Sequence, residues 1–247
     1  MRRVWAITVA ALAGCASTPA PAPREVTLLD EAEAALGMPE TLARFRGFHS
    51  TMKGTWLRPD GSTPYSAEAW YRPPLTLRWL KTTASVTEDG AVDGDSGWYR
   101  TNGAAAAPLD PARLREAQAT AVEYAILLVR PLRSKEFTLA YAGPSEAAGR
   151  PTETLRVSWR GAITRVVHFD RETHLVVKTE GPQQLQGQNG DLTLSVDRWA
   201  DEGGLRFPVQ THGEWNGARR FDCECTAVQW LEPPAESLFL APSPTKP

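Results

Sequence analysis

From Gly47 onward, apolar residues return at every second position in one short segment after another. In the first segment, Phe48, Met52 and Trp56 keep one register and polar residues stand between them. Since successive side chains of a β-strand point to opposite faces, this alternation predicts strands with one buried face. We count about ten or eleven such segments, and short turn signals separate most of them. The pattern therefore favours a long antiparallel sheet in which each strand pairs with the next.

The connections between these segments are marked by residue type. A Pro-Pro pair at 73–74 ends a strand, because proline has no N–H to donate to a sheet. Residues 170–174 separate two apolar strands as a hairpin turn, and Asn-Gly at 216–217 is typical of a type I′ turn. The acidic, glycine-rich residues 83–97 are interpreted as a loop.

One long helix is predicted between two groups of strands. Asp110 can accept hydrogen bonds at the start of the helix, and Pro111 suits the first helical position. Arg130 stands in the last turn and Pro131 ends the helix. The apolar residues at helical spacing are Leu114, Ala117, Ala121, Val122, Ala125, Leu128 and Val129. This stripe has to be buried, and the sheet is the partner that the sequence offers.

Residues 26–45 have helical spacing and precede the strands. Gly37 and Pro39 divide them into two short helices, and Thr27 with Asp30 has the spacing of a capping box. A sheet of this length twists and curls. We therefore expect a mainly β, α+β fold: a strongly curved antiparallel sheet, or half-barrel, of about ten or eleven strands, capped by one long helix and an N-terminal helical pair.

The first fifteen residues have the pattern of a bacterial secretion signal. Arg2 and Arg3 are followed by the apolar run 4–11, which is too short to span a bilayer as a permanent helix. Residues 12–14, Leu-Ala-Gly, stand directly before Cys15. This order resembles a lipobox, at which bacteria attach diacylglycerol to the cysteine and cut the chain before it. The alternative interpretation is an ordinary signal peptide that contains a cysteine by chance.

The lipobox interpretation divides the chain into four parts. Residues 1–14 are the signal peptide, 15–25 a lipidated tether, 26–242 a single domain and 243–247 a tail. Acyl chains such as palmitate would hold the protein on a membrane, since each buried methylene contributes about 0.8 kcal/mol. The residue after the cysteine, Ala16, resembles an outer-membrane sorting signal. We therefore expect a lipid-anchored protein on the periplasmic side of the bacterial outer membrane, with no defined protein partner.

Charge and composition limit the classes of partner. The chain has 27 basic and 29 acidic residues, so its net charge of −2 gives no attraction for nucleic acid. No second apolar segment is long enough to cross a membrane. A hydrophobic content of 42% suffices for a core, and the nine tryptophans can pack that core or line an apolar pocket. The sequence contains no cofactor-binding motif, so no cofactor is expected.

Several short motifs resemble the lipoprotein-carrier group, which includes the periplasmic chaperone and the outer-membrane receptor of the Lol lipoprotein-sorting system. They lie at 34–37 (Ala-Ala-Leu-Gly) and 42–46 (Leu-Ala-Arg-Phe-Arg), at the hairpin 166–180, at 204–208 (Gly-Leu-Arg-Phe-Pro) and at 238–242. In the hairpin, an apolar pair leads through Asp and Thr to a second apolar strand. The resemblance implies a curved half-barrel that binds or transfers a lipid or a lipoprotein acyl chain.

The ligand is expected in an apolar cavity between the sheet and the long helix. The candidate lining residues are Trp56, Leu75, Leu77, Trp79, Leu128, Val129, Leu155, Val157, Trp159, Leu192, Leu194 and Val196. Taken singly, each of them is more often a core residue than a ligand contact, whereas the resemblance favours a cavity for the group as a whole. The chain departs from the family pattern at His174, which stands where glycine is usual, at a position expected to need a positive φ. The receptor's protruding apolar loop has no counterpart that we can place.

Cys223 and Cys225 stand two apart on a predicted strand, on the same face as Phe221 and Ala227. We interpret them as small core residues. Their expected Cα separation of about 6.5 Å is near the upper limit for a disulfide. A redox pair and a metal site are the alternatives, although no nearby histidine or further cysteine supports the metal interpretation.

Two other functions are weighed against the carrier hypothesis. A structural or partner-binding envelope lipoprotein would have the same anchor and sheet but a filled interior. An enzyme is disfavoured, because the four histidines show no metal-ligand spacing and no nucleophile or phosphate-binding motif is present. His168 and Asp170 could orient a base, but such a pair at a strand end is usually a solvated face.

Overall fold

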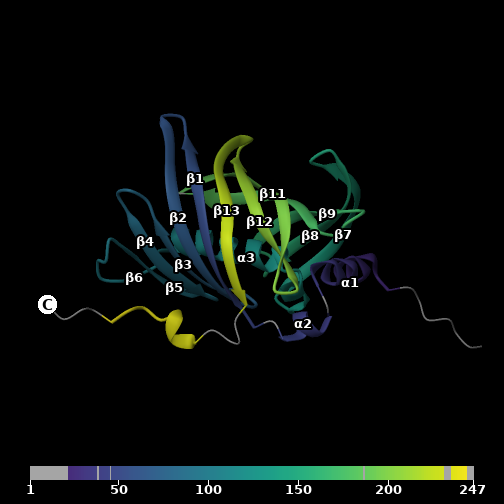
Figure 1. Ribbon diagram of the computed structural model, residues 1–247, viewed down its shortest axis with the longest axis horizontal. Coiled ribbons are helices and arrows are strands. Elements are labelled where there is room, and N and C mark those ends of the chain that lie inside the picture. Colours follow the sequence, from purple (N-terminus) through teal and green to yellow (C-terminus); the bar gives the residue numbers. More distant parts are fainter. Residues whose placement is uncertain (1–21, 38, 45, 186, 231–234, 244–247) are drawn as a thin grey trace, which may run out of the picture.

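Thirteen strands form a single antiparallel sheet within the part of the chain that the structure describes (Figure 1). The structure is a computed structural model, and it describes residues 22–243 except 38, 45, 186 and 231–234. The first half of the sheet contains β1 (Phe48–Arg58), β2 (Gly61–Arg72), β3 (Thr76–Thr82), β4 (Thr87–Asp93), β5 (Ser96–Thr101) and β6 (Ala107–Pro108). The second half contains β7 (Phe137–Ala147), β8 (Arg150–Trp159), β9 (Ile163–Asp170), β10 (Val176–Leu185), β11 (Gln188–Glu202), β12 (Leu205–Trp215) and β13 (Ala218–Trp230).

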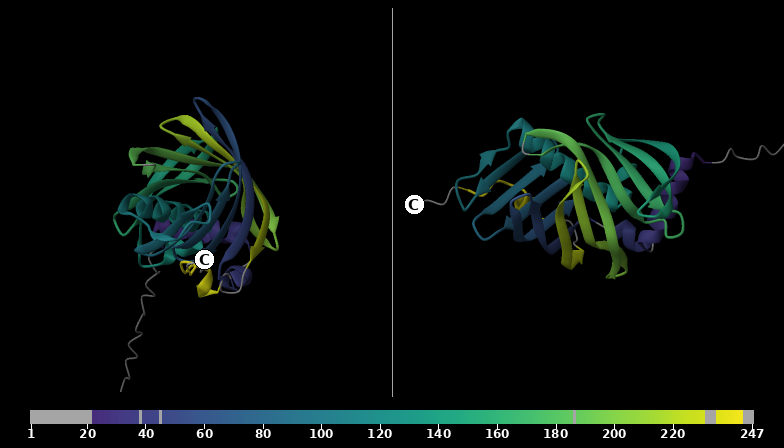
Figure 2. Two further views of the ribbon diagram at one scale, coloured as in Figure 1. Left: turned by 90° about the vertical axis from the view of Figure 1, so that its left-hand side faces the viewer. Right: turned by 90° about the horizontal axis from the view of Figure 1, so that it is seen from above.

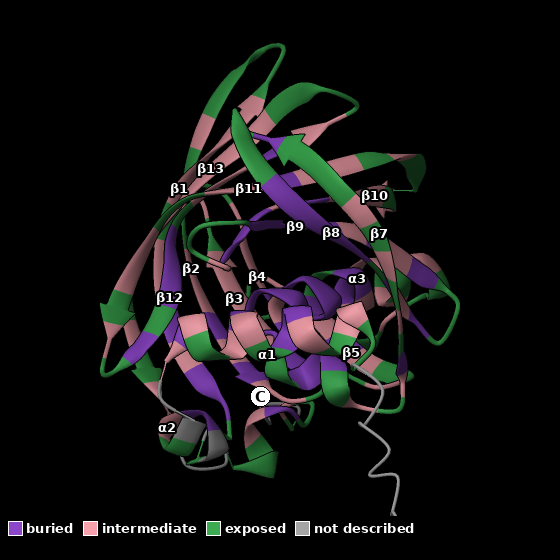
Figure 3. Ribbon diagram, turned by 90° about the vertical axis from the view of Figure 1, so that its right-hand side faces the viewer, coloured by how far each residue is buried: buried purple, intermediate pink, exposed green. Residues whose placement is uncertain are grey.

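The strand order explains where the long helix lies. The order across the sheet is β6-β5-β4-β3-β2-β1-β13-β12-β11-β10-β9-β8-β7. The first and last strands therefore pair in the middle, and β6 and β7 form the two edges. Because α3 (Pro111–Leu127) connects β6 to β7, it has to cross from one edge to the other. It does so on the inner, concave face, where it packs on β3, β4, β9 and β10 (Figures 2 and 3).

The ends of α3 were predicted with unequal success. Asp110 is the N-cap as expected, and its side chain accepts from the backbone N–H groups of Ala112 and Arg113. The helix ends at Leu127, however, before the predicted last turn at Arg130. Val129 has a φ of 58°, and the 3₁₀ turn η1 (Arg130–Arg133) follows it. The proline at 131 therefore belongs to this separate turn, and the α-helix is shorter than the sequence indicated.

Two short helices precede the sheet, as predicted. They are α1 (Arg24–Leu36) and α2 (Pro39–Arg44), and α1 packs on β7 and β12. The predicted capping box at Thr27 is wrong, because the helix starts earlier, with Pro23 as its N-cap residue. The Thr27 hydroxyl instead donates to the Pro23 carbonyl at 3.4 Å, inside the first turn. No described helix is both long and apolar enough to cross a membrane.

The predicted loop at 83–97 is wrong, and this error accounts for part of the difference in strand number. The segment contains β4 and the start of β5. Its carboxylates are paired with cations on neighbouring strands: Asp89 accepts from Arg78 at 3.2 Å and from Arg100 at 2.6 Å. Asp89 is only 4% exposed, so this pairing allows an acidic residue inside a sheet.

The segment after β13 contains a 3₁₀ turn, η2 (Glu236–Leu238). Phe239 is buried, and its carbonyl accepts from the indole N–H of Trp98 at 2.8 Å. The carbonyl of Leu238 accepts from Arg78 at 3.2 Å. This segment therefore covers the outer face of β3 to β5.

The two sheet edges differ in how they end. β6 has only two residues, and Pro108 lacks an N–H group. At the other edge, the pairing of β7 with β8 shifts between Tyr141 and Gly143, which marks a bulge, and Pro144 follows it. Neither edge is therefore a long, regular strand in which every outward-facing backbone N–H group is free to donate to another strand.

Two turns follow the sequence prediction closely. Asn216 and Gly217 have φ values of 51° and 76°, as a type I′ turn requires. His174 has a φ of 57°, the positive value expected where the family pattern has glycine. The turn before it is held by Asp170, whose carboxylate accepts from the backbone N–H of Glu172 at 2.9 Å and of Thr173 at 2.8 Å.

Asp170→Asn is expected to destabilise the fold at neutral pH by roughly 1 kcal/mol. Burial opposes the charge, but the two backbone N–H groups and Arg150 hold the pKa of the Asp170 carboxyl below its usual value. A lowered folded-state pKa stabilises the fold above the unfolded-state value, and this contribution is lost as the pH falls through the folded-state value. Urea unfolding at pH 7 and at pH 3 measures this. An equal difference between the two proteins at both pH values would contradict it.

Candidate functional site

The inner face of the sheet is only partly covered by α3, and a band of apolar side chains beyond the helix remains half-exposed. We call this band the open strip; its members are Met52, Trp56, Trp79, Leu192, Val196 and Phe221. Trp56 packs on Tyr65 with ring centroids 5.5 Å apart and edge-on against Phe221 at 5.2 Å. Half-exposed apolar side chains grouped on one face of a sheet are typical of binding surfaces.

The twelve predicted lining residues divide into two groups. Eight are buried in the main core: Leu75, Leu77, Leu128, Val129, Leu155, Val157, Trp159 and Leu194. The other four, Trp56, Trp79, Leu192 and Val196, belong to the open strip. The structure therefore places eight of them where they hold sheet and helix together, and four where a ligand could reach them.

The core beside the open strip is centred on Phe48 of β1, which is fully buried. Its ring contacts Tyr71, Tyr124, Phe207 and Trp230, with centroid distances of 5.6, 5.4, 5.1 and 6.2 Å. These residues come from β2, α3, β12 and β13, so this one cluster joins the helix to the middle of the sheet.

A buried polar cluster holds the middle of α3 on the sheet. Glu123 of α3 forms an ion pair with Arg165 of β9, whose side chain has no exposed surface. The second carboxylate oxygen of Glu123 accepts from the Thr179 hydroxyl of β10 at 2.7 Å. Arg165 also donates to the Pro182 carbonyl at 2.8 Å and to the Gln183 side chain at 2.6 Å. The donors of this buried guanidinium are thus distributed over several acceptors.

The sequence contained a signal for this cluster that the prediction missed. Arg165 alternates with Ile163, Val167 and Phe169 and so falls on the inward face of β9. A charged residue at an inward position needs a buried partner of opposite charge. Glu123 lies next to Val122 in the helix stripe, at a buried position.

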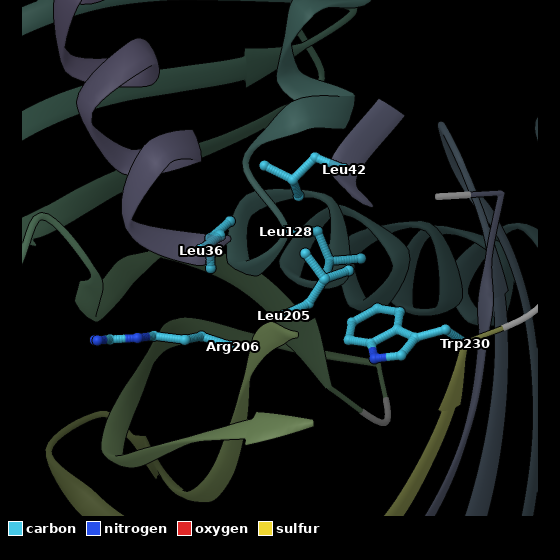
Figure 4. Close-up of a pocket in the computed structure, with 6 residues that line it drawn as sticks. All are labelled: Leu36, Leu42, Leu128, Leu205, Arg206 and Trp230. Carbon is cyan, nitrogen blue, oxygen red and sulfur yellow. The ribbon is translucent and has the colours of Figure 1, made fainter. Parts of the chain in front are cut away.

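A small apolar pocket lies where α1, α2 and the end of α3 meet β12 and β13. Its volume is about 10 Å³, which is barely space for one water molecule. The lining residues are Leu36, Leu42, Leu128, Leu205, Arg206 and Trp230 (Figure 4). Figure 4 shows the Arg206 side chain directed away from the apolar side chains. This part of the interior is filled rather than open.

A larger groove of about 560 Å³ lies at β1, β2, β12 and β13. Its charged side chains are already paired, Lys53 with Glu224 at 3.1 Å and Arg219 with Asp222 at 2.5 Å. A third carboxylate of the lining, Asp197 of β11, pairs with His212 at 2.8 Å, so each charged side chain of the groove already has a partner.

The histidines do not form a catalytic group. His168 pairs with Glu180 at 3.1 Å rather than with Asp170, which holds its own turn. His49 of β1 pairs with Glu68, and His212 of β12 pairs with Asp197, each at 2.8 Å. Within the described ranges, no three His, Cys, Asp or Glu side chains come close enough together to hold a metal ion.

Comparison with known proteins identifies the fold. No protein-family model matches the chain, and no curated protein matches its sequence. Three solved structures match most of it. A domain assigned by name to outer membrane lipoprotein sorting, from Vibrio parahaemolyticus, has a TM-score of 0.58 and 10% identity over 87% of this chain and 96% of its own.

The other two structures agree with the first. A LolA superfamily protein from Nitrosomonas europaea has a TM-score of 0.62 and 10% identity, over 87% of this chain and 97% of its own. A DUF1329 family protein from Desulfovibrio piger has a TM-score of 0.57 and 9% identity, over 87% of this chain and 97% of its own. The Lol-type resemblance predicted from the sequence is confirmed at the level of the fold: this chain has the curved-sheet architecture of the LolA and lipoprotein-sorting proteins.

Proposed function

We propose that this protein is a lipoprotein of the bacterial outer membrane, exposed to the periplasm, that binds or transfers a lipid or a lipoprotein acyl chain. The observation that carries the proposal is the open strip on the inner face. An acyl chain laid on it would bury apolar surface on both partners, worth about 0.8 kcal/mol for each methylene group. The names of the similar structures, which refer to lipoprotein sorting and to LolA, agree with this function.

The ligand position follows from how the helix is held. Because Glu123 and Arg165 fix the middle of α3 on β9, and Phe48 packs against Tyr124 of the same helix, the ligand binds beside α3 rather than beneath it. Trp56, Trp79, Leu192 and Val196 would contact the acyl chain. The eight buried lining residues would support the surface from behind.

The membrane anchor is part of the proposal. Cys15 and the other residues of the secretion signal lie outside the described residues. The sequence before Cys15 supports lipidation there, and the first described helix starts at Arg24. The intervening residues would form a tether that lets the open strip face the periplasm.

A second candidate function has its own supporting observation. The pocket in Figure 4 has a volume of only about 10 Å³, which suits a structural or partner-binding lipoprotein with a filled interior. In that case the open strip would be covered by another protein. The two functions differ in whether lipid is found on the protein.

Native mass spectrometry distinguishes them. The chain after Cys15 is exported behind a cleavable signal peptide and recovered from a bacterial periplasm without detergent. A discrete added mass that organic solvent extracts as lipid is the expected result. A clean mass, together with no uptake of a fluorescent fatty acid, would support the structural function instead.

Leu192→Arg is expected to remove the bound lipid and to lower the affinity for a fluorescent fatty acid at least about tenfold, because a charge would enter the apolar contact. The neighbouring Thr193→Arg is the matched control. It faces the outer side of the same strand, opposite Glu180 and Glu214, and should bind like the parent. Lipid retained by folded Leu192→Arg protein would exclude the open strip as the site. Leu77 is unsuitable for this test because it is buried in the core.

A further inference from the structure

Three sulfur atoms are brought to one place on the inner face. Cys223 and Cys225 stand two apart on β13, and both pair with positions on β1. The register partner of Cys225 is Met52, so a thioether lies directly across from a thiol. Side chains directly opposite in an antiparallel pair have Cβ atoms about 4.5–5.5 Å apart, and those two apart on a strand share a face.

A β-bulge fixes this arrangement. The register of β1 with β13 shifts between Thr51 and Met52: Thr51 pairs with Ala227, whereas Met52 pairs with Cys225. The extra residue, Thr226, turns Ala227 to the outer face, so the prediction that Ala227 shares a face with the cysteines is wrong. Bulges often re-aim side chains beside functional sites. Here the bulge follows directly after the second thiol, and the inward positions resume at Val228, which pairs with Ser50.

Two phenol groups lie beside the sulfur atoms, and Cys223 also borders the groove that is lined by the carboxylates of Asp222 and Glu224. The Tyr124 hydroxyl of α3 donates to the Met52 sulfur at 3.8 Å. The Tyr65 side chain of β2 lies within hydrogen-bonding reach of Cys223. Both cysteines are free thiols and half-exposed, so a small solute can reach them.

We propose that Cys223, Cys225 and Met52 bind one Cu(I) ion through two thiolates and one thioether. Soft sulfur ligands select Cu(I) among the common metal ions. Zinc sites use cysteine, histidine and carboxylate ligands, so a thioether as the third ligand disfavours zinc. The inference does not depend on the lipid-binding function, because the test below reads metal binding alone.

The geometry accommodates such an ion. Metal–thiolate bonds are about 2.3 Å long in zinc proteins, so two thiolates on one metal stand about 4.6 Å apart when they are opposed. Two cysteine side chains whose Cα atoms are about 6.5 Å apart reach that separation by rotation about χ1. Methionine has three rotatable side-chain bonds, which lets its sulfur approach from the next strand.

Binding releases protons. Each thiol loses its proton when it binds the metal as a thiolate, and one Cu(I) ion with two thiolates gives a complex with one negative charge.

The test uses the full chain carrying Cys15→Ser, which leaves Cys223 and Cys225 as its only thiols. Under anaerobic conditions the protein is titrated into the coloured Cu(I)–bicinchoninate complex. We expect loss of colour equivalent to one Cu(I) per chain. Cys223→Ser and Cys225→Ser should each weaken binding by at least about a hundredfold, and Met52→Leu by about tenfold. Met38→Leu removes the other internal methionine and should bind like the parent.

Four results would overturn the proposal: no colour change with both thiols free, binding unaffected by Met52→Leu, displacement of Cu(I) by equimolar Zn²⁺, or a Cys223–Cys225 disulfide in protein isolated without air. Circular dichroism of each variant separates loss of the site from loss of the fold. A double variant, Cys223→Ala with Cys225→Ala, keeps the surface apolar and must also fail to bind.

Discussion

Replacing Glu123 with leucine is expected to lower the free energy of unfolding by about 3–5 kcal/mol. The substitution leaves the Arg165 guanidinium buried without its counter-charge, although its bonds to the Pro182 carbonyl and Gln183 remain. It also removes the acceptor of the Thr179 hydroxyl. Urea unfolding followed by circular dichroism measures the change.

The double variant Glu123→Leu with Arg165→Met is the control. If the unpaired charge causes the loss, removing the charge should restore most of the stability, because apolar replacements of a buried ion pair are often neutral or stabilising. A double variant less stable than Glu123→Leu alone would show that the cluster stabilises the fold in itself. Lipid uptake by the double variant would also show whether the anchoring of α3 matters for binding.

Phe48→Ala is expected to destabilise the protein by about 3–5 kcal/mol, through lost burial and the cavity that remains. Phe48 is completely buried and contacts four aromatic rings from four elements. The midpoint and slope of urea unfolding report the effect.

Phe221→Ala is the matched comparison, since Phe221 lies on the same face of the sheet but is only half-buried. Its loss should cost less than half as much, because less apolar surface leaves the interior. Equal costs at the two positions would mean that Phe221 is part of the core, and the open strip would then be smaller than we describe.

The sequence was sufficient for the elements whose signals are local. Alternation identified the strands around Phe48 and Leu155, and Asp110 with Pro111 located the start of α3. The turn at Asn216 was equally clear, because its residue types fit one backbone conformation. Such signals depend on a few neighbouring residues and need no knowledge of the partner strands.

Features that depend on distant partners were missed. Asp89 indicated a loop because its cations, Arg78 and Arg100, are contributed by other strands. Ala227 was predicted on the wrong face, because a β-bulge does not change the hydrophobic pattern of the strand that contains it. These errors have one physical cause. The conformation depends on pairing with neighbouring strands, and the sequence of one strand carries no information about its partners.

The candidate site was predicted only in part for a related reason. Periodicity showed which residues face inward, but it could not show how far α3 would cover them. Leu192 and Leu194 have the same pattern in the sequence, yet Leu194 is buried and Leu192 is half-exposed. The difference arises from where the helix crosses the sheet, which depends on the distance between the two edges.

Those edges have a consequence for a protein that displays half-exposed apolar side chains. An open sheet can extend by pairing its edge with strands of other molecules, and exposed apolar side chains make such association more frequent. The two-residue β6 ending in Pro108, and the bulge and Pro144 in β7, interrupt the backbone donors that an incoming strand would need. The features that oppose self-assembly thus lie at the two edges of the sheet, and they leave the apolar inner surface unchanged.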